Sequence, residues 1–215
     1  MVGSRVCIPL ARRLATLLAM AALATALGGV APAAAGGKPM PLTSGQRSVA
    51  AANRQVADAL AANPGSRRIS ATSVLLAPGV VMTIPGPVPA GATMAVPIPG
   101  GRQVTVAAAD TSCASGYLCM WQHVYRAGAK LAFYYCNTQN LGNYYISPGN
   151  SWRDDISSIW NHQTGGVVSY FYDWKGLGYV RVGSLSAGNY LQDLTRDRAA
   201  DGGTWNDRID QVSVC

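Results

Sequence analysis

The chain contains the stretch WRDDISSI at residues 152–159, and 53 residues later it contains WNDRIDQV at residues 205–212. The two stretches share the pattern W-x-D-x-I-x-x-[I/V]. We interpret the shared positions as structural, with an Asp that caps a turn, an Ile that points into the core and a Trp that covers a sheet edge. A structural role explains the repeated block better than a direct binding role.

An aromatic β-hairpin is predicted upstream of each copy. The first spans residues 117–135 and turns near Ala127-Gly128, and the second spans residues 167–182 and turns near residues 175–178. Side chains of the second hairpin alternate between two faces, with Val168, Tyr170 and Tyr172 on one and Ser169, Phe171 and Asp173 on the other. Two copies of hairpin, connection and final strand predict a mainly β fold in which two Greek-key motifs pack as a β-sandwich.

The acidic and histidine side chains limit the chemistry that the chain can perform. All ten acidic residues are Asp, and the only two histidines are His123 and His162. No H-E-x-x-H zinc site, Glu general base or His-rich metal centre can be built from this composition. Neither His has a Ser or Cys nucleophile in a recognisable setting, and Asp154 and Asp155 would point to opposite faces of an extended strand. We therefore predict that the chain is not an enzyme.

The first residues are typical of an export signal. Arg5, Arg12 and Arg13 precede an uncharged Ala/Leu-rich run at residues 14–30, and residues 33–35 supply the small side chains that signal peptidase requires. The run is short and rich in Ala, which argues against a transmembrane anchor. The sequence predicts a signal peptide at residues 1–36 and a secreted, extracellular protein that has no membrane partner once the signal is cleaved.

The remaining chain divides into two dissimilar parts, because all five Trp, ten Tyr and two Phe residues lie at or after Tyr117. Residues 37–85 predict a small helix-plus-hairpin module or prosegment, with a helix that Ser44 can cap and strands at 69–76 and 80–84. The apolar residues at helical spacing are Val49, Ala52, Val56, Leu60 and Ala61. Residues 86–112 predict a Pro/Gly/Ala-rich linker, and residues 113–215 the aromatic domain. The sequence does not decide whether the first module is a docking module, a prosegment or a spacer.

The formal net charge of +7 follows the same division. Three of the positive charges belong to the signal, and the remaining excess lies in residues 37–112, away from the aromatic side chains. A nucleic-acid-binding surface would place Lys and Arg beside aromatic residues. We therefore expect no nucleic-acid partner.

Loss of the signal also removes Cys7 and leaves four cysteines, Cys113, Cys119, Cys136 and Cys215. An even number of cysteines in an exported chain predicts two disulfides. Four cysteines permit three pairings, and the sequence alone does not choose among them.

The aromatic part resembles the Streptomyces metalloproteinase inhibitor (SMPI) family. The resemblance rests on CASGYLC at residues 113–119, its continuation LCMWQH at 118–123, DISSIWN at 155–161, and the ending NDRI through VSVC at 206–215. It covers about residues 113–215 and implies a secreted peptidase inhibitor with a two-motif, βγ-crystallin-like fold. It also implies a Cys113–Cys119 disulfide, which leaves Cys136–Cys215 as the second bond.

Inhibition of a protease requires a rigid loop with a substrate-like shape, so that little ordering entropy is lost on binding. The best candidate is the second hairpin tip, where the predicted protease contacts are Asp173, Trp174, Lys175, Gly176 and Leu177. The founding inhibitors brace their loop with a second local disulfide, whereas no cysteine occurs here between Asn137 and Val214. Their inhibitory residues therefore cannot be transferred position by position.

Calcium binding is the second chemistry that the resemblance suggests. βγ-Crystallin modules bind Ca²⁺ through two Asn/Asp residues, two variable positions and two hydroxyl residues. The first copy here has Arg153 at the first ligand position, and the second copy lacks both hydroxyls. Oxygen ligands nevertheless abound, as Ca²⁺ requires. A calcium site would use Asp154, Ser157, Asn206, Asp207 and Asp210, and no other cofactor is predicted.

Together these features predict a monomeric, secreted inhibitor of an extracellular protease, with a metalloprotease as the target class. The alternative is a calcium-binding or cell-envelope-binding structural module of βγ-crystallin type without inhibitory activity.

Overall fold

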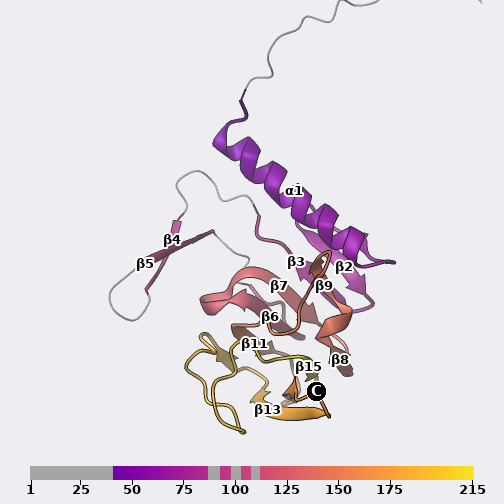
Figure 1. The fold of residues 1–215 in the computed structure, drawn as a ribbon, viewed down its shortest axis with the longest axis vertical. Helices are drawn as coiled ribbons and strands as arrows, with labels where there is room; N and C mark the ends of the chain where they lie inside the picture. Colours follow the sequence, from indigo (N-terminus) through magenta and orange to yellow (C-terminus); the bar gives the residue numbers. More distant parts are fainter. Residues whose placement is uncertain (1–40, 87–92, 98–102, 108–111) are drawn as a thin grey trace, which may run out of the picture. The chain divides into compact units, whose positions relative to one another are not determined.

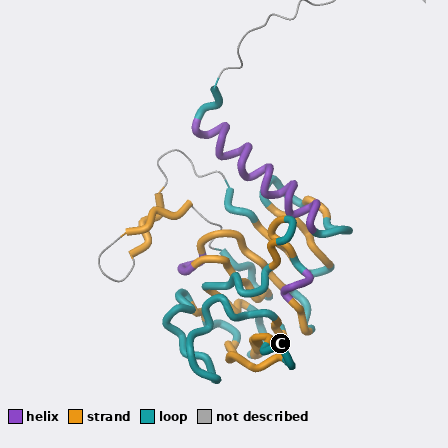
Figure 2. The backbone as a smooth tube through the Cα atoms, in the orientation of Figure 1, coloured by secondary structure: helices purple, strands orange, loops and turns teal. Residues whose placement is uncertain are grey.

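The computed structural model describes residues 41–86, 93–97, 103–107 and 112–215 (Figure 1). The predicted signal peptide and parts of the predicted linker lie outside these residues. Strands and loops make up most of the described chain beyond one long helix, as Figure 2 shows. The prediction of a mainly β fold is therefore confirmed.

The helix α1 spans Ser44–Ala62 and begins one residue earlier than expected. Its N-cap is Thr43, whose hydroxyl accepts from the Gln46 amide at 3.3 Å while its own amide donates to Gln46 Oε1 at 2.8 Å. This reciprocal capping box satisfies two amides that a helix start leaves unpaired, so Ser44 is not the cap. The buried helical residues are Ala52, Val56 and Ala59. The predicted core residues Val49 and Ala61 are exposed.

Two sheets form the body of the molecule. The larger has the strand order β1 (Arg67–Arg68), β2 (Ser73–Ala77), β3 (Val80–Thr83), β7 (Ala127–Phe133), β6 (Tyr117–His123), β11 (Ser158–His162) and β14 (Tyr190–Leu191). The smaller has the order β13 (Tyr179–Ser186), β12 (Val168–Trp174), β15 (Gln211–Ser213) and β8 (Thr138–Asn140). All these neighbouring strands pair antiparallel.

Each half of the aromatic part contributes one strand to the sheet of the other half. Strand β8 precedes β11 in the chain but pairs with β15, and β14 follows β13 but pairs with β11. Short elements complete the described chain. They are η1 (Val124–Arg126), η2 (Leu141–Asn143), the pair β9 (Tyr145–Ser147) and β10 (Asn150–Ser151), and the pair β4 (Thr93–Pro97) and β5 (Gln103–Ala107). The exchange of β8 and β14 ties the two halves together.

The part before residue 87 joins the larger sheet directly. Strand β3 pairs with β7 along its whole length, in a register that sets Val81 opposite Ala132 and Met82 opposite Leu131 (Figure 1). The same buried cluster contains Val56, Met82, Leu131 and Ile159. A segment without aromatic residues therefore needs no core of its own, because it uses that of the aromatic part. Further along, the segment expected to be a linker contains the antiparallel pair β4–β5.

The predicted turn position is confirmed for the second hairpin and wrong for the first. The second turns between Trp174 and Tyr179, as predicted, and its Ser169, Phe171 and Asp173 side chains are buried on one face. The first turns through η1, before the predicted Ala127-Gly128. Tyr125 and Arg126 there have φ values of 57° and 63°, a left-handed conformation that neither residue type announces in the sequence.

The repeated blocks bond to each other across the molecule. The Asp154 amide donates to Ile209 O at 3.4 Å, and the equivalent Asp207 amide donates to Ile156 O at 3.2 Å. Both Asp residues are left-handed, with φ of 54° and 51°. The two isoleucines are fully buried, as expected. Trp152 and Trp205 are also buried core residues. The prediction that the Trp of each block covers a sheet edge is wrong for Trp152, which has no exposed surface.

Two disulfides close the aromatic part. Cys113 pairs with Cys119, and Cys136 pairs with Cys215 over a sequence separation of 79. These are the pairings that the family resemblance implies. The second bond fixes the end of the chain beside the segment that follows β7. Within the described ranges, no helix has the length and apolar character needed to span a membrane.

Asn63 anchors the end of α1 to the aromatic part. Its buried side chain donates to Ala59 O and Tyr145 O, both at 2.7 Å, and accepts from the Tyr145 amide at 2.9 Å. Replacement by Ala leaves the Tyr145 amide and carbonyl without this partner in a part-buried site. We expect Asn63→Ala to lower the free energy of unfolding by about 2 to 4 kcal/mol, measured by urea denaturation. Asn53→Ala, at an exposed position on the same helix, is the control and should change it by well under about 1 kcal/mol.

Candidate functional site

The tip of the β12–β13 hairpin exposes the largest apolar side chains of this region. Leu177 is completely exposed, at 102% of its reference surface, and Trp174 is 45% exposed. The turn is closed by the Lys175 amide, which donates to Gly178 O at 2.9 Å. Gly176 has a φ of 82°, which a residue with a Cβ rarely adopts. The tip thus presents a leucine between two glycines on a closed turn.

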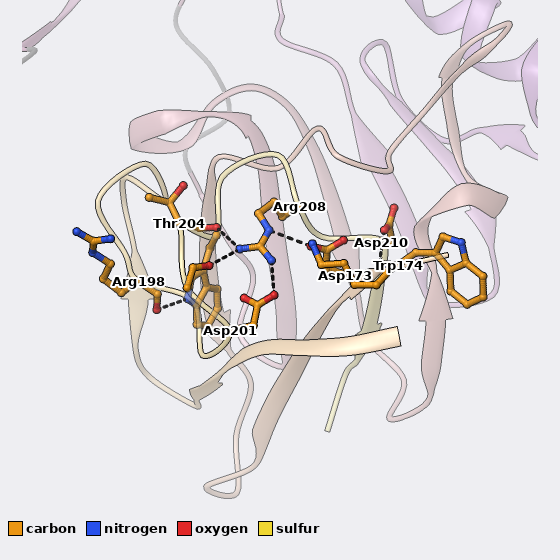
Figure 3. Close-up of polar contacts among 10 residues, drawn as sticks. Asp173, Trp174, Arg198, Asp201, Thr204, Arg208 and Asp210 are labelled. Atoms are coloured by element: carbon orange, nitrogen blue, oxygen red, sulfur yellow. Dashed lines mark hydrogen bonds and ion pairs between the residues drawn. The ribbon is translucent and has the colours of Figure 1, made fainter. Parts of the chain in front are cut away.

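Polar contacts hold the base of this tip. Asp173 is buried, and its Oδ2 lies 2.5 Å from Lys175 Nζ and 2.9 Å from Arg208 Nε. The Trp174 amide donates to Asp210 Oδ2 at 2.7 Å, and the Trp174 ring packs edge-on against Tyr179 with centroids 5.0 Å apart. Figure 3 shows Asp173 beside the Arg208 guanidinium, with Trp174 and Asp210 beyond it. The charges of Asp173 and Lys175 are therefore paired with each other, and the projecting part of the tip is neutral and apolar.

Arg208, Asp201 and Thr204 belong to this site although the sequence did not point to them. Arg208 occupies the position in the second repeated block where the first block has Asp155. At this position the two blocks carry opposite charges, and this reversal is the signal that could have identified Arg208. Asp201 and Thr204 lie in a loop whose contacts depend on the fold and carry no motif.

The five predicted calcium residues fall into two groups, each formed across the repeat. Asp154 lies near Asp210, where Arg153 Nε is 3.9 Å from Asp210 Oδ1. Asp207 accepts a hydrogen bond from Asn206 Nδ2, and the Ser157 hydroxyl lies near the same carboxylate. The guanidinium of Arg153 supplies positive charge in the first group, which does not suit a cation site. The described part of the chain contains no cluster of three or more His, Cys, Asp or Glu side chains that could hold a metal ion.

Neither histidine has a catalytic setting. His162 Nδ1 lies 2.7 Å from Cys113 O, and its ring stacks on Trp160 with centroids 4.6 Å apart. His123 lines a shallow cavity of about 260 Å³ with Gln122 and Gly128. The contacts of both histidines are therefore those of packing residues.

One comparison with known proteins found a family that matches part of the chain. Residues 106–183 match the model of peptidase inhibitor family I36, the SMPI family that the sequence resembles. The matched range contains the whole β12–β13 turn. Because this is a family of inhibitors, the match agrees with the prediction that the chain is not an enzyme.

A solved structure described as "Evolution of the eye lens beta-gamma-crystallin domain fold" is also similar. It is 18% identical, covers 47% of this chain and 87% of its own, and has a TM-score of 0.32. Among curated proteins no match was found.

Burial raises the pKa of Asp154, and the nearby carboxylates of Asp210 and Asp173 raise it further, while Arg153 lowers it. A folded-state pKa above the unfolded value means that the folded protein holds a proton which the unfolded chain has lost. Between the two values stability therefore falls as pH rises, and above the folded pKa the loss is complete. Protonation of Asp154 at mildly acid pH should stabilise the fold.

We expect Asp154→Asn to raise the melting temperature at pH 7 and to flatten its decline as the pH rises from about 4, the ordinary pKa of an aspartate, to neutral. Asn tolerates the left-handed backbone of this position nearly as well as Asp. The measurement is thermal unfolding followed by circular dichroism across this pH range. Asp58→Asn, at an exposed position on α1, serves as the control. An unchanged pH profile in Asp154→Asn would contradict a raised folded-state pKa of Asp154.

Proposed function

We propose that the chain is a secreted, monomeric inhibitor of an extracellular protease of the metalloprotease class, and that the β12–β13 tip contacts the enzyme. Residues 1–36 would be the signal peptide that exports it. The proposal includes the reading of β6, β7, β8 and β11, and of β12 to β15, as two Greek-key motifs of a βγ-crystallin-type sandwich. The exchanged strands β8 and β14 support that reading.

The observation that carries the proposal is the completely exposed Leu177 on a braced turn inside the range that matches an inhibitor family. Leu177 and Trp174 are both exposed on this tip, and apolar side chains held together on a closed turn suit an apolar pocket in a partner. The ordered turn and the paired charges at its base mean that binding would cost little ordering entropy. A protease substrate pocket is the partner that this shape fits.

The test is a titration of the secreted chain against a thermolysin-like metalloprotease and, in parallel, a subtilisin-like serine protease. We expect inhibition of the metalloprotease at micromolar or lower concentration. Leu177→Asp places a charge at the pocket and should weaken inhibition by at least about tenfold, an effect of the size seen for a central interface residue. Leu42→Asp, at another exposed leucine, should inhibit normally.

Each result of this titration bears on a different part of the proposal. Inhibition of the serine protease alone would overturn the metalloprotease class, and no inhibition of either enzyme would overturn the function. If Leu177→Asp inhibits as well as the wild type does, the tip is not part of the surface that contacts the protease.

We further propose that residues 41–86 are a retained part of the mature protein. Their removal would leave the β7 edge, with Leu131 and Phe133 behind it, open to water and to other chains. This argues against a removable prosegment.

Insertion of a specific protease site at residue 100 tests the retention directly. After cleavage we expect the two pieces to co-elute on gel filtration, because β3 remains paired with β7 and Asn63 with Tyr145. Separate elution, with the piece that begins after residue 100 keeping the melting temperature of the intact chain, would show that the N-terminal part is dispensable. Sequencing of the secreted form should find a start near residue 37.

A further inference from the structure

We propose that Arg208 is the positioning residue of the protease-contact tip, so that its guanidinium holds the β12–β13 turn by tying it to the loop at residues 198–204. This inference rests on the proposed function and names the side chain on which the shape of the binding surface depends. It assigns a role to a residue that lies outside the tip itself.

The guanidinium uses four of its five N–H donors. Nε donates to Asp173 Oδ2 at 2.9 Å and Nη2 to Asp201 Oδ2 at 2.6 Å, while Nη1 donates to Gly202 O at 2.7 Å and Thr204 O at 3.2 Å (Figure 3). The side chain is only 21% exposed. A planar group with donors fixed in a fork holds two acceptor-bearing segments in one geometry, which a lysine cannot reproduce.

The loop to which Arg208 donates hydrogen bonds is itself attached to the sheet. Its Ala200 amide donates to Val182 O of β13 at 2.8 Å, and Trp205 Nε1 donates to Arg198 O at 2.9 Å. The Trp205 ring lies so close to Gly183 that a Cβ at this glycine would sit 1.9 Å from it. The loop is therefore anchored beside β13, and Arg208 carries that anchorage across to Asp173 at the end of β12.

The position of Asp173 makes this contact effective. It is the residue before Trp174, and the Trp174 amide is held in turn by Asp210. The turn from Lys175 to Gly178 has one backbone hydrogen bond of its own. Fixing Asp173 through Arg208 and Trp174 through Asp210 sets the direction in which the turn leaves the sheet. Arg208 and Asp210 belong to the same repeated block. The block that bonds to the other half of the fold therefore also sets the orientation of the tip.

The fold itself does not require this network. In the first repeated block the equivalent residue, Asp155, accepts a hydrogen bond from Gln122 Nε2 at 2.7 Å, and the same frame forms around it. Without Arg208, Asp173 would still be paired with Lys175. Loss of the guanidinium should loosen the tip while the core around Ile209 and Trp205 stays folded.

The experiment compares wild type, Arg208→Gln, Arg208→Lys and Asp201→Asn in the full secreted chain. Hydrogen exchange of residues 173–178 is measured by mass spectrometry, together with inhibition of the thermolysin-like enzyme and with cleavage of the tip by that enzyme. Arg196→Gln removes an exposed arginine paired with Asp193 and is the matched control.

For Arg208→Gln we expect exchange at the tip to be faster by about tenfold or more and inhibition to be weaker by a similar factor, since charge-assisted hydrogen bonds are lost. The loosened tip should also be cut, so that the inhibitor becomes a substrate. Arg208→Lys should recover part of both effects, and Asp201→Asn should show a smaller loss. Exchange in the β6 and β11 amides should not change, which separates a local effect from unfolding.

Unchanged exchange at residues 173–178 in both Arg208→Gln and Asp201→Asn would overturn the inference, even if wild type inhibits. If wild type inhibits neither enzyme, the proposed function is wrong, and the exchange data still decide whether Arg208 positions the tip. If Arg208→Gln fails to fold, Asp201→Asn supplies the decisive comparison, because its carboxylate lies at the surface end of the network.

Discussion

The reciprocal hydrogen bonds between the two repeated blocks are the constraint on which the structure depends. The Asp154 amide donates to Ile209 O, and the Asp207 amide donates to Ile156 O. The backbone is left-handed at both Asp residues. Further backbone bonds follow the same symmetry, since Leu194 donates to Ser157 O and Leu141 to Asp210 O. These contacts place the two isoleucines in one core and bring together strands from both halves of the chain. Each block needs hydrogen-bond partners from the other half of the aromatic part, so the two halves fold as one unit.

The sequence predicted this frame because the frame is repeated. Two copies of one pattern with an aromatic hairpin before each were enough to indicate a mainly β fold of two related halves. The alternation from Val168 to Asp173 separated the two faces of β12, because a half-buried strand has a period of two residues. The structure then shows that the face with Ser169, Phe171 and Asp173 is the buried one. The tip between Trp174 and Tyr179 could be located for the same reason, with glycines marking its turn.

Other features could not be predicted, because they depend on contacts between distant segments or on unusual backbone. The pairing of β3 with β7 leaves no local pattern, so the sequence predicts residues 37–85 as a separate module. The first hairpin turns at Tyr125 and Arg126, which have a conformation that usually favours glycine. Thr43 rather than Ser44 caps α1, and neighbouring hydroxyl residues are indistinguishable in such a motif. Arg208 is one arginine among several until the fold places it beside two carboxylates.

The two halves share a frame but differ at the tips of their hairpins. In the first half the turn is bound to the body, because the Tyr125 amide donates to Gln192 O and the Arg126 amide to Ser158 Oγ. Its outer strand β7 is covered by β3. In the second half the outer strand β13 is covered in part by the loop at residues 198–204, whose Ala200 amide bonds to Val182 O. The turn there is held only at its base, so Leu177 projects freely. The repeated frame therefore has one hairpin tip bonded to the body and one presented to solvent. Arg208, at a position where the two blocks carry opposite charges, contacts the base of the presented tip.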